Sequence, residues 1–551
     1  ISACLVGSEM CIRDRFVARH MDEFDYVIVG AGSAGCVLAR RLVDAGHSVC
    51  LLEAGPPDRS IWIHLPIGYG KTMWHRRLNW RFETEPDPGM NGRRLYWPRG
   101  KTLGGSSAIN GLIYIRGQRQ DYDGWAKAGN PGWSFPEVLP YFVKSEGNER
   151  GADNLHGASG PLAVSDIKGK DELIEALITG AEELGIPRNP DFNGLTQEGA
   201  GYYQLNTRRG LRCSTAVGYL RPVWRNSRLA VRTGALAFRI LFDGKRAVGV
   251  AYSRGGERLE ARAKREVVLA AGAIQSPQLL QLSGIGPPEL LTSFGIPLLA
   301  ASAEVGENLQ DHLQLRLIYR CTRPITTNDQ LRSLSGRARI GLQWLLRRSG
   351  PLAVGINQGG IFARAWPESE RPDVQFHCAT LSADMAGGKV HPFSGFTLSV
   401  CQLRPGSRGF VRIRSPDPVE PPAMQPFYLS TELDRRTAVA AIRLARSLAA
   451  TSAVRPYVAE EVTPGPGIAG DEEILGFARE AGATIFHPSG TCRMGSDARA
   501  VVDPRLRVKG VERLRVVDAS IMPSLVSGNT NAGVVMIAEK ASDMIVEEAR
   551  G

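Results

Sequence analysis

Hydrophobic positions change their spacing several times along the chain, and these changes predict alternating strands and helices. Residues 25–29 form a short apolar run with β-branched side chains, which is typical of a buried strand. Residues 34–45 have a helical pattern that ends at Gly46, and residues 48–52 predict a second strand. A strand, a tight turn, a helix and a further strand in this order form a parallel βαβ unit.

Two later apolar runs have the same character as the first strand. Residues 266–270 and residues 514–517 predict buried strands, and helical patterns follow them over 276–282 and 530–545. Buried strands that alternate with helices indicate an α/β fold around a parallel sheet.

The segments between these runs have a different pattern. Residues 171–184 predict an amphipathic helix that ends at Gly185, and residues 434–450 predict a longer one with a single apolar face. Residues 397–414 alternate in the manner of sheet. We therefore expect a second, α+β domain of sheet and helices that is interleaved with the first.

A glycine-rich turn connects the first strand to its helix. Residues 30–35 match GxGxxG, with Gly30 for the turn, Gly32 for the approach of a pyrophosphate and Gly35 for helix packing. The helix N-terminus there offers N–H groups to phosphates. Glu53, at the end of the second strand, is placed to accept hydrogen bonds from ribose hydroxyls. Residues 465–470 also match, but they follow Pro464 and no predicted strand, so we interpret them as a turn.

Composition argues against several classes of function. The formal net charge is +11, but the arginines are scattered, so a nucleic-acid partner is not expected. The nine cysteines form no CxxC pair, which argues against a metal site or disulfide framework and fits a reducing cytoplasm. No apolar run reaches the roughly 18 residues of a transmembrane helix.

The first residues do not resemble a targeting signal. Residues 1–20 lack the apolar core of a signal peptide, and Met21 stands just before the first strand. We expect Met21 to be the natural start, and the residues before it in the segment 1–21 to be a non-native leader.

Three further stretches carry a family resemblance. They are Pro98–Asn110 with its GGSS turn, Gly272–Gly286, and His487–Cys492 with residues 517–520 and 527–532 behind it. With the glycine motif they resemble the glucose–methanol–choline (GMC) oxidoreductases, in particular the choline dehydrogenase-like and aliphatic alcohol dehydrogenase branch. The resemblance implies a Rossmann-like FAD domain over residues 22–159, 227–312 and 483–551, and a substrate domain over 160–226 and 313–482.

The resemblance also implies which residues hold the cofactor. The GGSS loop should lie beside the flavin ring, Asp518 and Ala519 near the phosphates, and the Val231 backbone at the adenine. Ile109 stands where some relatives have the histidine that attaches the flavin, so we expect non-covalent FAD. The expected cofactor-binding residues are Gly30, Ala31, Gly32, Ser33, Gly35, Glu53, Gly104, Gly105, Ser106, Asn110, Val231, Asp518 and Ala519.

Alcohol oxidation needs a base for the hydroxyl proton and an acceptor for the hydride. His487 matches the family's catalytic histidine and is a residue type suited to proton transfer. Asn531 is expected to stabilise the alkoxide, and Asn529 competes for that role. His312 is expected to be structural, and Cys492 is expected to serve packing.

The resemblance predicts oxidation of a primary alcohol to an aldehyde, with electrons passed to a quinone-type acceptor. Gln314 stands where choline-specific relatives have a glutamate, which favours an uncharged alcohol. Choline dehydrogenase, an oxidase that uses O2, a cyanohydrin lyase and a fatty-acid photodecarboxylase stay open as alternatives. A cytoplasmic protein with peripheral contact to the inner membrane face is compatible with such an acceptor.

Overall fold

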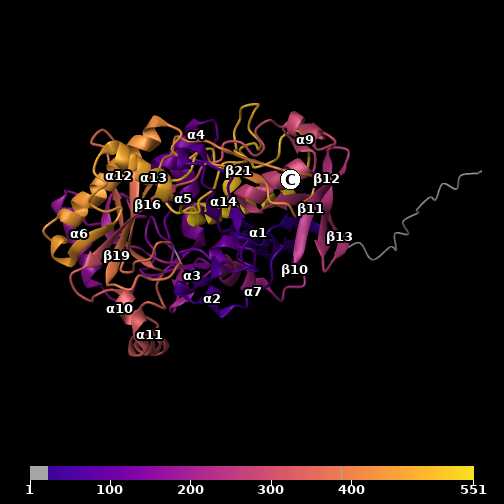
Figure 1. Cartoon of the computed structure of the whole chain (residues 1–551). Helices are drawn as coiled ribbons and strands as arrows, with labels where there is room; N and C mark the ends of the chain where they lie inside the picture. The colour runs from indigo at the N-terminus through magenta and orange to yellow at the C-terminus, as the bar shows by residue number, and fades with distance from the viewer. Residues whose placement is uncertain (1–22, 386, 551) are drawn as a thin grey trace, which may run out of the picture.

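Two seven-stranded sheets organise the molecule, which is seen here in a computed structural model that describes residues 23–385 and 387–550. In Figure 1 one sheet lies on the right, around β13 (Glu257–Leu269), and the other lies on the left, around β19 (Gly395–Gln402). The predicted leader, residues 1–21, lies outside the described residues. The mixed α/β architecture agrees with the predicted fold class.

The first sheet has a parallel centre and an antiparallel edge. Its order is β10-β2-β1-β13-β12-β11, with β24 beside β13. The strands β10, β2, β1, β13 and β24 are parallel to one another, and their buried apolar runs are typical of parallel sheets. The bounds are β1 Glu23–Val29, β2 Val49–Glu53, β10 Leu229–Thr233, β11 Ala235–Asp243, β12 Arg246–Arg254, β13 Glu257–Leu269 and β24 Leu514–Val516.

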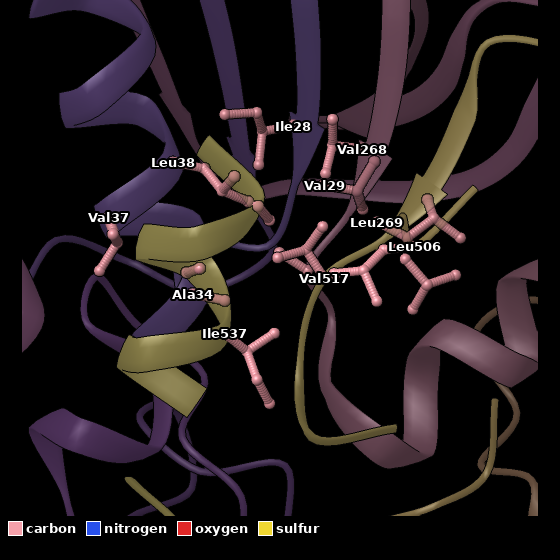
Figure 2. Close-up of a cluster of buried hydrophobic side chains, with 14 of the residues drawn as sticks. Ile28, Val29, Ala34, Val37, Leu38, Val268, Leu269, Leu506, Val517 and Ile537 are labelled. Carbon is pink, nitrogen blue, oxygen red and sulfur yellow. The ribbon is translucent and has the colours of Figure 1, made fainter. Parts of the chain in front are cut away.

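Two helices from opposite ends of the chain pack together on this sheet. They are α1 (Ser33–Asp44) and α14 (Asn531–Arg550). Figure 2 shows Ile537 of α14 near Ala34 of α1, beneath the strand ends at Val29. All three side chains are buried, and each large aliphatic residue so placed contributes roughly 1.5–3 kcal/mol to stability.

The second sheet is antiparallel throughout. Its order is β22-β16-β19-β18-β17-β7, with β23 beside β16. The bounds are β7 Gly199–Tyr202, β16 Leu313–Cys321, β17 Asn357–Ala363, β18 Val374–Ala379, β19 Gly395–Gln402, β22 Val458–Thr463 and β23 Ala483–Thr484.

Helices cover the outer face of this second sheet. Leu317, Phe376 and Leu398 share a hydrophobic core with residues of α12 (Glu432–Ala450) and α6 (Glu172–Glu183). Figure 1 shows these helices on the outer side of β16 and β19. Because side chains alternate along a strand, the residues between them point to the opposite face, toward the interior of the molecule.

Most predicted elements exist, with shifted ends. The helix predicted over 276–282 begins earlier, as α8 (Gly272–Leu282), and α14 runs on to Arg550. The expected sheet over 397–414 is β19 and the short β20 (Phe410–Arg412).

The second glycine motif needs one correction. Residues 465–470 do follow a strand, β22, and precede a helix, α13 (Asp471–Ala481). The sequence missed this strand because its residues are mostly polar and partly exposed. It is an antiparallel edge strand, so the motif lacks the parallel-sheet edge that a nucleotide site requires.

The residues of β23 fall in the segment predicted for the FAD domain, yet β23 pairs with β16 of the second sheet. No helix among the described residues is long and apolar enough to cross a membrane.

Candidate active site

The glycine-rich turn lies where β1 ends and α1 begins. Gly30 has φ +97°, and a Cβ atom on it would stand 2.6 Å from the Ala270 carbonyl oxygen, so only glycine fits there. Gly35 faces the Gly30 carbonyl inside α1. Gly32 and Ser33 line a cavity of about 1040 Å³. The turn therefore presents backbone and a helix N-terminus to that cavity, as a dinucleotide requires.

Glu53 lies at the end of β2 and lines the same cavity. Its carboxylate accepts hydrogen bonds from the backbone N–H groups of Ala31, at 3.0 Å, and Gly55, at 2.8 Å. Burial raises the pKa of Glu53 to about 7, although these N–H groups and Lys101 oppose the shift. The carboxylate is therefore fixed in orientation beside the turn.

The GGSS loop packs directly on the glycine turn. The Gly104 N–H donates to the Ala31 carbonyl at 2.8 Å. A Cβ atom on Gly105 would stand 2.6 Å from the Gly32 Cα, so the two loops touch backbone to backbone. Ser106 accepts a hydrogen bond from Arg99, and Asn110 accepts one from Arg212 at 2.7 Å. The loop thus forms a second wall of the cavity without side-chain bulk.

Asp518 and Ala519 form a third wall next to these loops. The strand ends at Val29, Leu269 and Val516 are in register, so the segments that follow them meet at one edge of the sheet. The Asp518 carboxylate accepts from the Gly272 N–H at 2.8 Å and from the Ser276 hydroxyl at 2.6 Å. This edge of a doubly wound sheet is where nucleotide ligands bind.

His487 is buried at the other end of the cavity, against His312. Their Nδ1 atoms are 3.0 Å apart, and the His312 Nε2 is 2.9 Å from the Leu403 carbonyl oxygen. The His487 N–H donates to Asp311 at 2.7 Å, which fixes the backbone. Burial, and then unfavourable electrostatic interactions with His312, His377 and Arg99, hold the pKa of His487 well below its usual range. The imidazole is therefore neutral at ordinary pH.

The two candidate asparagines have different neighbours. The Asn529 Nδ2 is 3.3 Å from the His487 Nε2, and the Asn529 Oδ1 accepts from the Gln375 Nε2 at 3.1 Å. Asn531 is the first residue of α14, and its Oδ1 accepts from the Ser33 hydroxyl at 2.8 Å. Asn529 is thus the amide in contact with the histidine, whereas Asn531 contacts the glycine turn.

Most predicted site residues line the cavity, and four do not. Ala31, Gly35, Gly104 and Val231 lie behind its walls. Val231 sits in β10, paired with Leu51 of β2. Cys492 is fully buried in the core of the first sheet, in agreement with a packing role. The lining residues are Gly30, Gly32, Ser33, Glu53, Gly105, Ser106, Asn110, His487, Asp518, Ala519, Asn529 and Asn531.

Sequence reasoning singled out Gln314 but missed the other polar side chains on the inner face of the second sheet. Gln314 and Arg316 of β16, His377 of β18 and Ser399 of β19 all line the cavity. The period-two pattern of each strand could have grouped Gln314 with Arg316. It gives no signal for which strands stand side by side.

These residues fit a flavin dinucleotide. Glycine backbones, a helix N-terminus and a fixed carboxylate occupy one end of the cavity, and a neutral histidine with an amide donor occupies the other. When FAD is bound, Gly32, Ser33, Glu53 and Asp518 would hold its dinucleotide part, and Gly105, Ser106 and Asn110 would flank its ring system.

Comparison with known proteins extends over nearly the whole chain. Models of the GMC oxidoreductase family match residues 24–314 and 405–538. Human mitochondrial choline dehydrogenase is 44% identical over 534 residues, which is 95% of this chain and 90% of that protein. An "alcohol dehydrogenase [acceptor]" of Pseudomonas putida is 42% identical over 530 residues, 95% of this chain and 96% of its own.

A solved structure agrees in fold and cofactor. An FAD-dependent oxidoreductase from Chaetomium thermophilum aligns with a TM-score of 0.88 and 27% identity, covering 96% of this chain and all of its own. FAD is thus the cofactor, and the predicted class of enzyme, an FAD-dependent oxidoreductase of alcohols, is confirmed. The chain belongs to the GMC oxidoreductase family.

Proposed function

We propose that this protein oxidises a primary alcohol to an aldehyde, with His487 as the base that removes the hydroxyl proton. FAD, when bound, supplies the hydride acceptor at its N5 position. The hydrogen-bond chain from Leu403 through His312 to His487 carries the proposal, because it determines which nitrogen of His487 is free to accept a proton.

The Leu403 carbonyl oxygen determines the tautomers of His312 and His487. A carbonyl oxygen only accepts, so the Nε2 of His312 carries the proton that it donates to Leu403. Burial lowers the pKa of His312 to about 4, so the ring is neutral and its Nδ1 has a lone pair. The Nδ1–H of His487 then donates to that lone pair. The Nε2 of His487 is left unprotonated, as a general base must be.

Asn529 supplies the hydrogen bond that steadies the developing alkoxide. Because its Oδ1 accepts from Gln375, its NH2 group is turned toward the His487 Nε2. A substrate oxygen between Asn529 and His487 would lose its proton to the histidine while accepting a hydrogen bond from the amide. This proposal gives Asn529 the role expected of Asn531, and it assigns Asn531 to the cofactor side through Ser33.

The test is anaerobic reduction of the bound flavin by excess primary alcohol, followed by absorbance in a stopped-flow instrument. We expect His487→Ala to lower the reduction rate by at least about 10²–10⁴-fold while the protein keeps its flavin. His64→Ala is a matched control, because His64 is half-buried and outside the cavity lining. Unchanged reduction by His487→Ala would exclude His487 as the base.

We further propose that FAD is held without a covalent bond. Ile109 lines the cavity at the family's attachment position, and an aliphatic side chain cannot form that bond. Acid precipitation should release all of the flavin to the supernatant. Flavin that stays with the denatured chain would contradict this.

The electron acceptor is proposed to be a membrane quinone, reached through contact of α11 (Leu334–Arg347) with anionic lipid. Figure 1 shows α11 projecting from the body next to α10 (Thr327–Arg332). Leu342, Leu345 and Leu346 of α11 are 56–71% exposed, and arginines flank them. Arg337 of the same helix lines the cavity. An exposed apolar stripe with basic flanks is typical of helices that lie in a membrane interface.

Vesicle flotation tests this contact. We expect binding to vesicles that contain phosphatidylglycerol, and a loss of about 10-fold or more when all three leucines are changed to serine. Leu195→Ser is the control, because Leu195 is 96% exposed but lies outside α11. Equal binding by both variants would refute the contact, and faster turnover with O2 than with a quinone would refute the acceptor.

A further inference from the structure

The substrate end of the cavity is walled by the inner face of the second sheet. Arg316 of β16 stands opposite Ser399 of β19, and Ser399 stands opposite His377 of β18. The three side chains therefore form one row across the sheet, and all three line the cavity. Their neighbours on the outer face, such as Leu317 and Phe376, belong to the hydrophobic core.

Arg316 has no anionic partner. Its Nε donates to the neutral Gln314 Oε1 at 3.2 Å, and no carboxylate of the described residues lies within ion-pair distance of it. Burial lowers the pKa of Arg316, an effect that Tyr69 opposes. A guanidinium in a cavity is costly without a counter-charge, and buried charges are normally paired. The partner that this group lacks is an anion.

His377 lacks partners as well. It is fully buried, and neither ring nitrogen has a hydrogen-bond partner among the described residues. Burial, and then the charges of His312 and Arg316, lower its pKa to about 3, so the ring is neutral and offers one N–H donor. Native structures rarely leave such a group unsatisfied, so this side chain is also available to a ligand in the cavity.

The charged residues that line the substrate end of the cavity are basic. The acidic lining residues are Glu53, Glu420 and Asp518, and none of them lies on the second sheet or on the segments around α3 (Tyr69–Thr72) and α11. Those elements contribute Lys71, Arg316 and Arg337. Such a field attracts anions and repels a quaternary ammonium.

We propose that the alcohol oxidised by this protein carries a carboxylate, which binds Arg316 together with His377 and Ser399. This substrate class rests on the proposed alcohol oxidation. A planar guanidinium matches a carboxylate through two parallel hydrogen bonds, and the neutral histidine and the hydroxyl add donors beside it.

The position of Arg316 also limits the length of the substrate. Arg316 is four residues beyond His312 on an extended chain, so their Cα atoms are about 13 Å apart at about 3.3 Å per residue. His312 contacts His487, at the reacting end of the cavity. After allowance for the length of the arginine side chain, a spacer of several carbon atoms separates the hydroxyl from the carboxylate.

The experiment compares ω-hydroxycarboxylates with the 1-alkanols of equal chain length, and with choline, as anaerobic reductants of the bound flavin. For the parent protein we expect the highest kcat/KM with a hydroxycarboxylate. Arg316→Gln should lower that value by about 10–150-fold and leave the value for the alkanol within a few-fold. Arg316→Lys should restore part of the loss, because the charge returns without the planar fork.

Arg320→Gln is the matched control. Arg320 lies on the same strand but is paired with Glu460 and does not line the cavity, so neither substrate should be affected. Calorimetric titration with an alkanoate that has no hydroxyl adds a readout that is independent of turnover, and Arg316→Gln should weaken its binding to a similar degree. A thermal melt of the flavin-bound variants checks that they fold.

The outcomes separate the two proposals. If alkanols or choline reduce the flavin faster than hydroxycarboxylates, and Arg316→Gln does not change the ratio, the anionic substrate is refuted while alcohol oxidation stands. If no alcohol of any charge reduces the flavin, alcohol oxidation itself is refuted. A hydroxycarboxylate preference that Arg316→Gln abolishes supports both.

Discussion

The two ends of the cavity are built on opposite principles. At the nucleotide end, backbone groups and short polar side chains already satisfy one another, as where Glu53 receives two N–H groups and Asp518 receives a hydroxyl and an N–H. At the substrate end, His377 has unsatisfied ring nitrogens and Gln375 has an unsatisfied Oε1. The first end is preorganised for one cofactor, and the second is completed only by what it binds.

Adding one side chain should destroy the nucleotide end. A Cβ on Gly35 would stand 1.8 Å from the Gly30 carbonyl oxygen, so Gly35→Val forces α1 away from β1 and should prevent both folding and flavin binding. Gly46→Ala is the control, because its Cβ would have nothing within 4 Å; its φ of +93° should still cost of the order of 1 kcal/mol. The measurement is the flavin content and melting temperature of the purified protein. A Gly35→Val protein with full flavin content would contradict this account of the turn.

Changing each of the two asparagines to alanine should show where the substrate end of the cavity meets the nucleotide end. Asn529→Ala should lower the rate of flavin reduction by about 10²–10³-fold, the usual cost of losing one donor to a developing oxyanion. Asn531→Ala should act instead on flavin affinity, because its contact is with Ser33. Stopped-flow reduction and flavin dissociation constants, measured on both variants, separate the two effects. The reverse assignment would follow if Asn531→Ala alone slowed reduction.

Acid should destabilise the substrate end through its buried histidines. The pKa of His312 is about 4 in the folded protein and about 6.5 in the unfolded chain, so the unfolded chain takes up the proton first. Stability is therefore fully present above pH 6.5 and is lost as the pH falls toward 4, by about 3 kcal/mol for this one group. Urea unfolding across that range should show a smaller decline in His312→Gln than in the parent. An identical decline would mean that other groups cause it.

Replacing Gln375, which holds the Asn529 amide in place, should have the smallest effect on flavin reduction. Gln375→Leu removes the donor that orients the Asn529 carbonyl, and with it the unsatisfied Oε1. We expect reduction by alcohol to slow by about 2- to 10-fold, since one supporting hydrogen bond contributes about 1 kcal/mol. The midpoint of urea unfolding should fall slightly, because the Gln375 Nε2 also donates to the Tyr203 hydroxyl and both of its acceptors lose that donor. A loss as large as that of Asn529→Ala would show that Gln375 contacts the substrate itself.

The nucleotide end of the cavity could be predicted from the sequence better than the substrate end. Gly30 and Glu53 could be placed because they lie at the ends of two strands with a clear local pattern, and the family resemblance implied the place of Asp518. The ends of these parallel strands meet at one edge of the sheet. Arg316 and His377 could not be placed, since the pairing of β16, β19 and β18 joins segments far apart in the chain. Local alternation says which residues share a face of one strand but not which strands become neighbours.

The proposed catalytic residues, His487 and Asn529, could be predicted only in part. The family resemblance points to His487 as the base that we propose, whereas the sequence gives no sign that His312 touches it. That contact joins residues 175 positions apart. Asn529 and Asn531 are two residues apart and equally polar. Their directions differ because Asn531 begins α14, whereas Asn529 precedes the helix, after Gly528 with φ +145°.

The hydrogen bond from Ser33 to Asn531 joins residues 498 positions apart, at the starts of α1 and α14. Translation reaches α14 after the glycine turn and the whole second sheet, so the ribosome releases both before the helix that packs on α1 exists. A nascent chain that ends before α14 therefore contains the glycine turn, Glu53 and Asp518, but it lacks the helix that covers α1. Premature termination before α14 should leave a polypeptide that retains no flavin and depends on chaperones, whatever the state of its other domain.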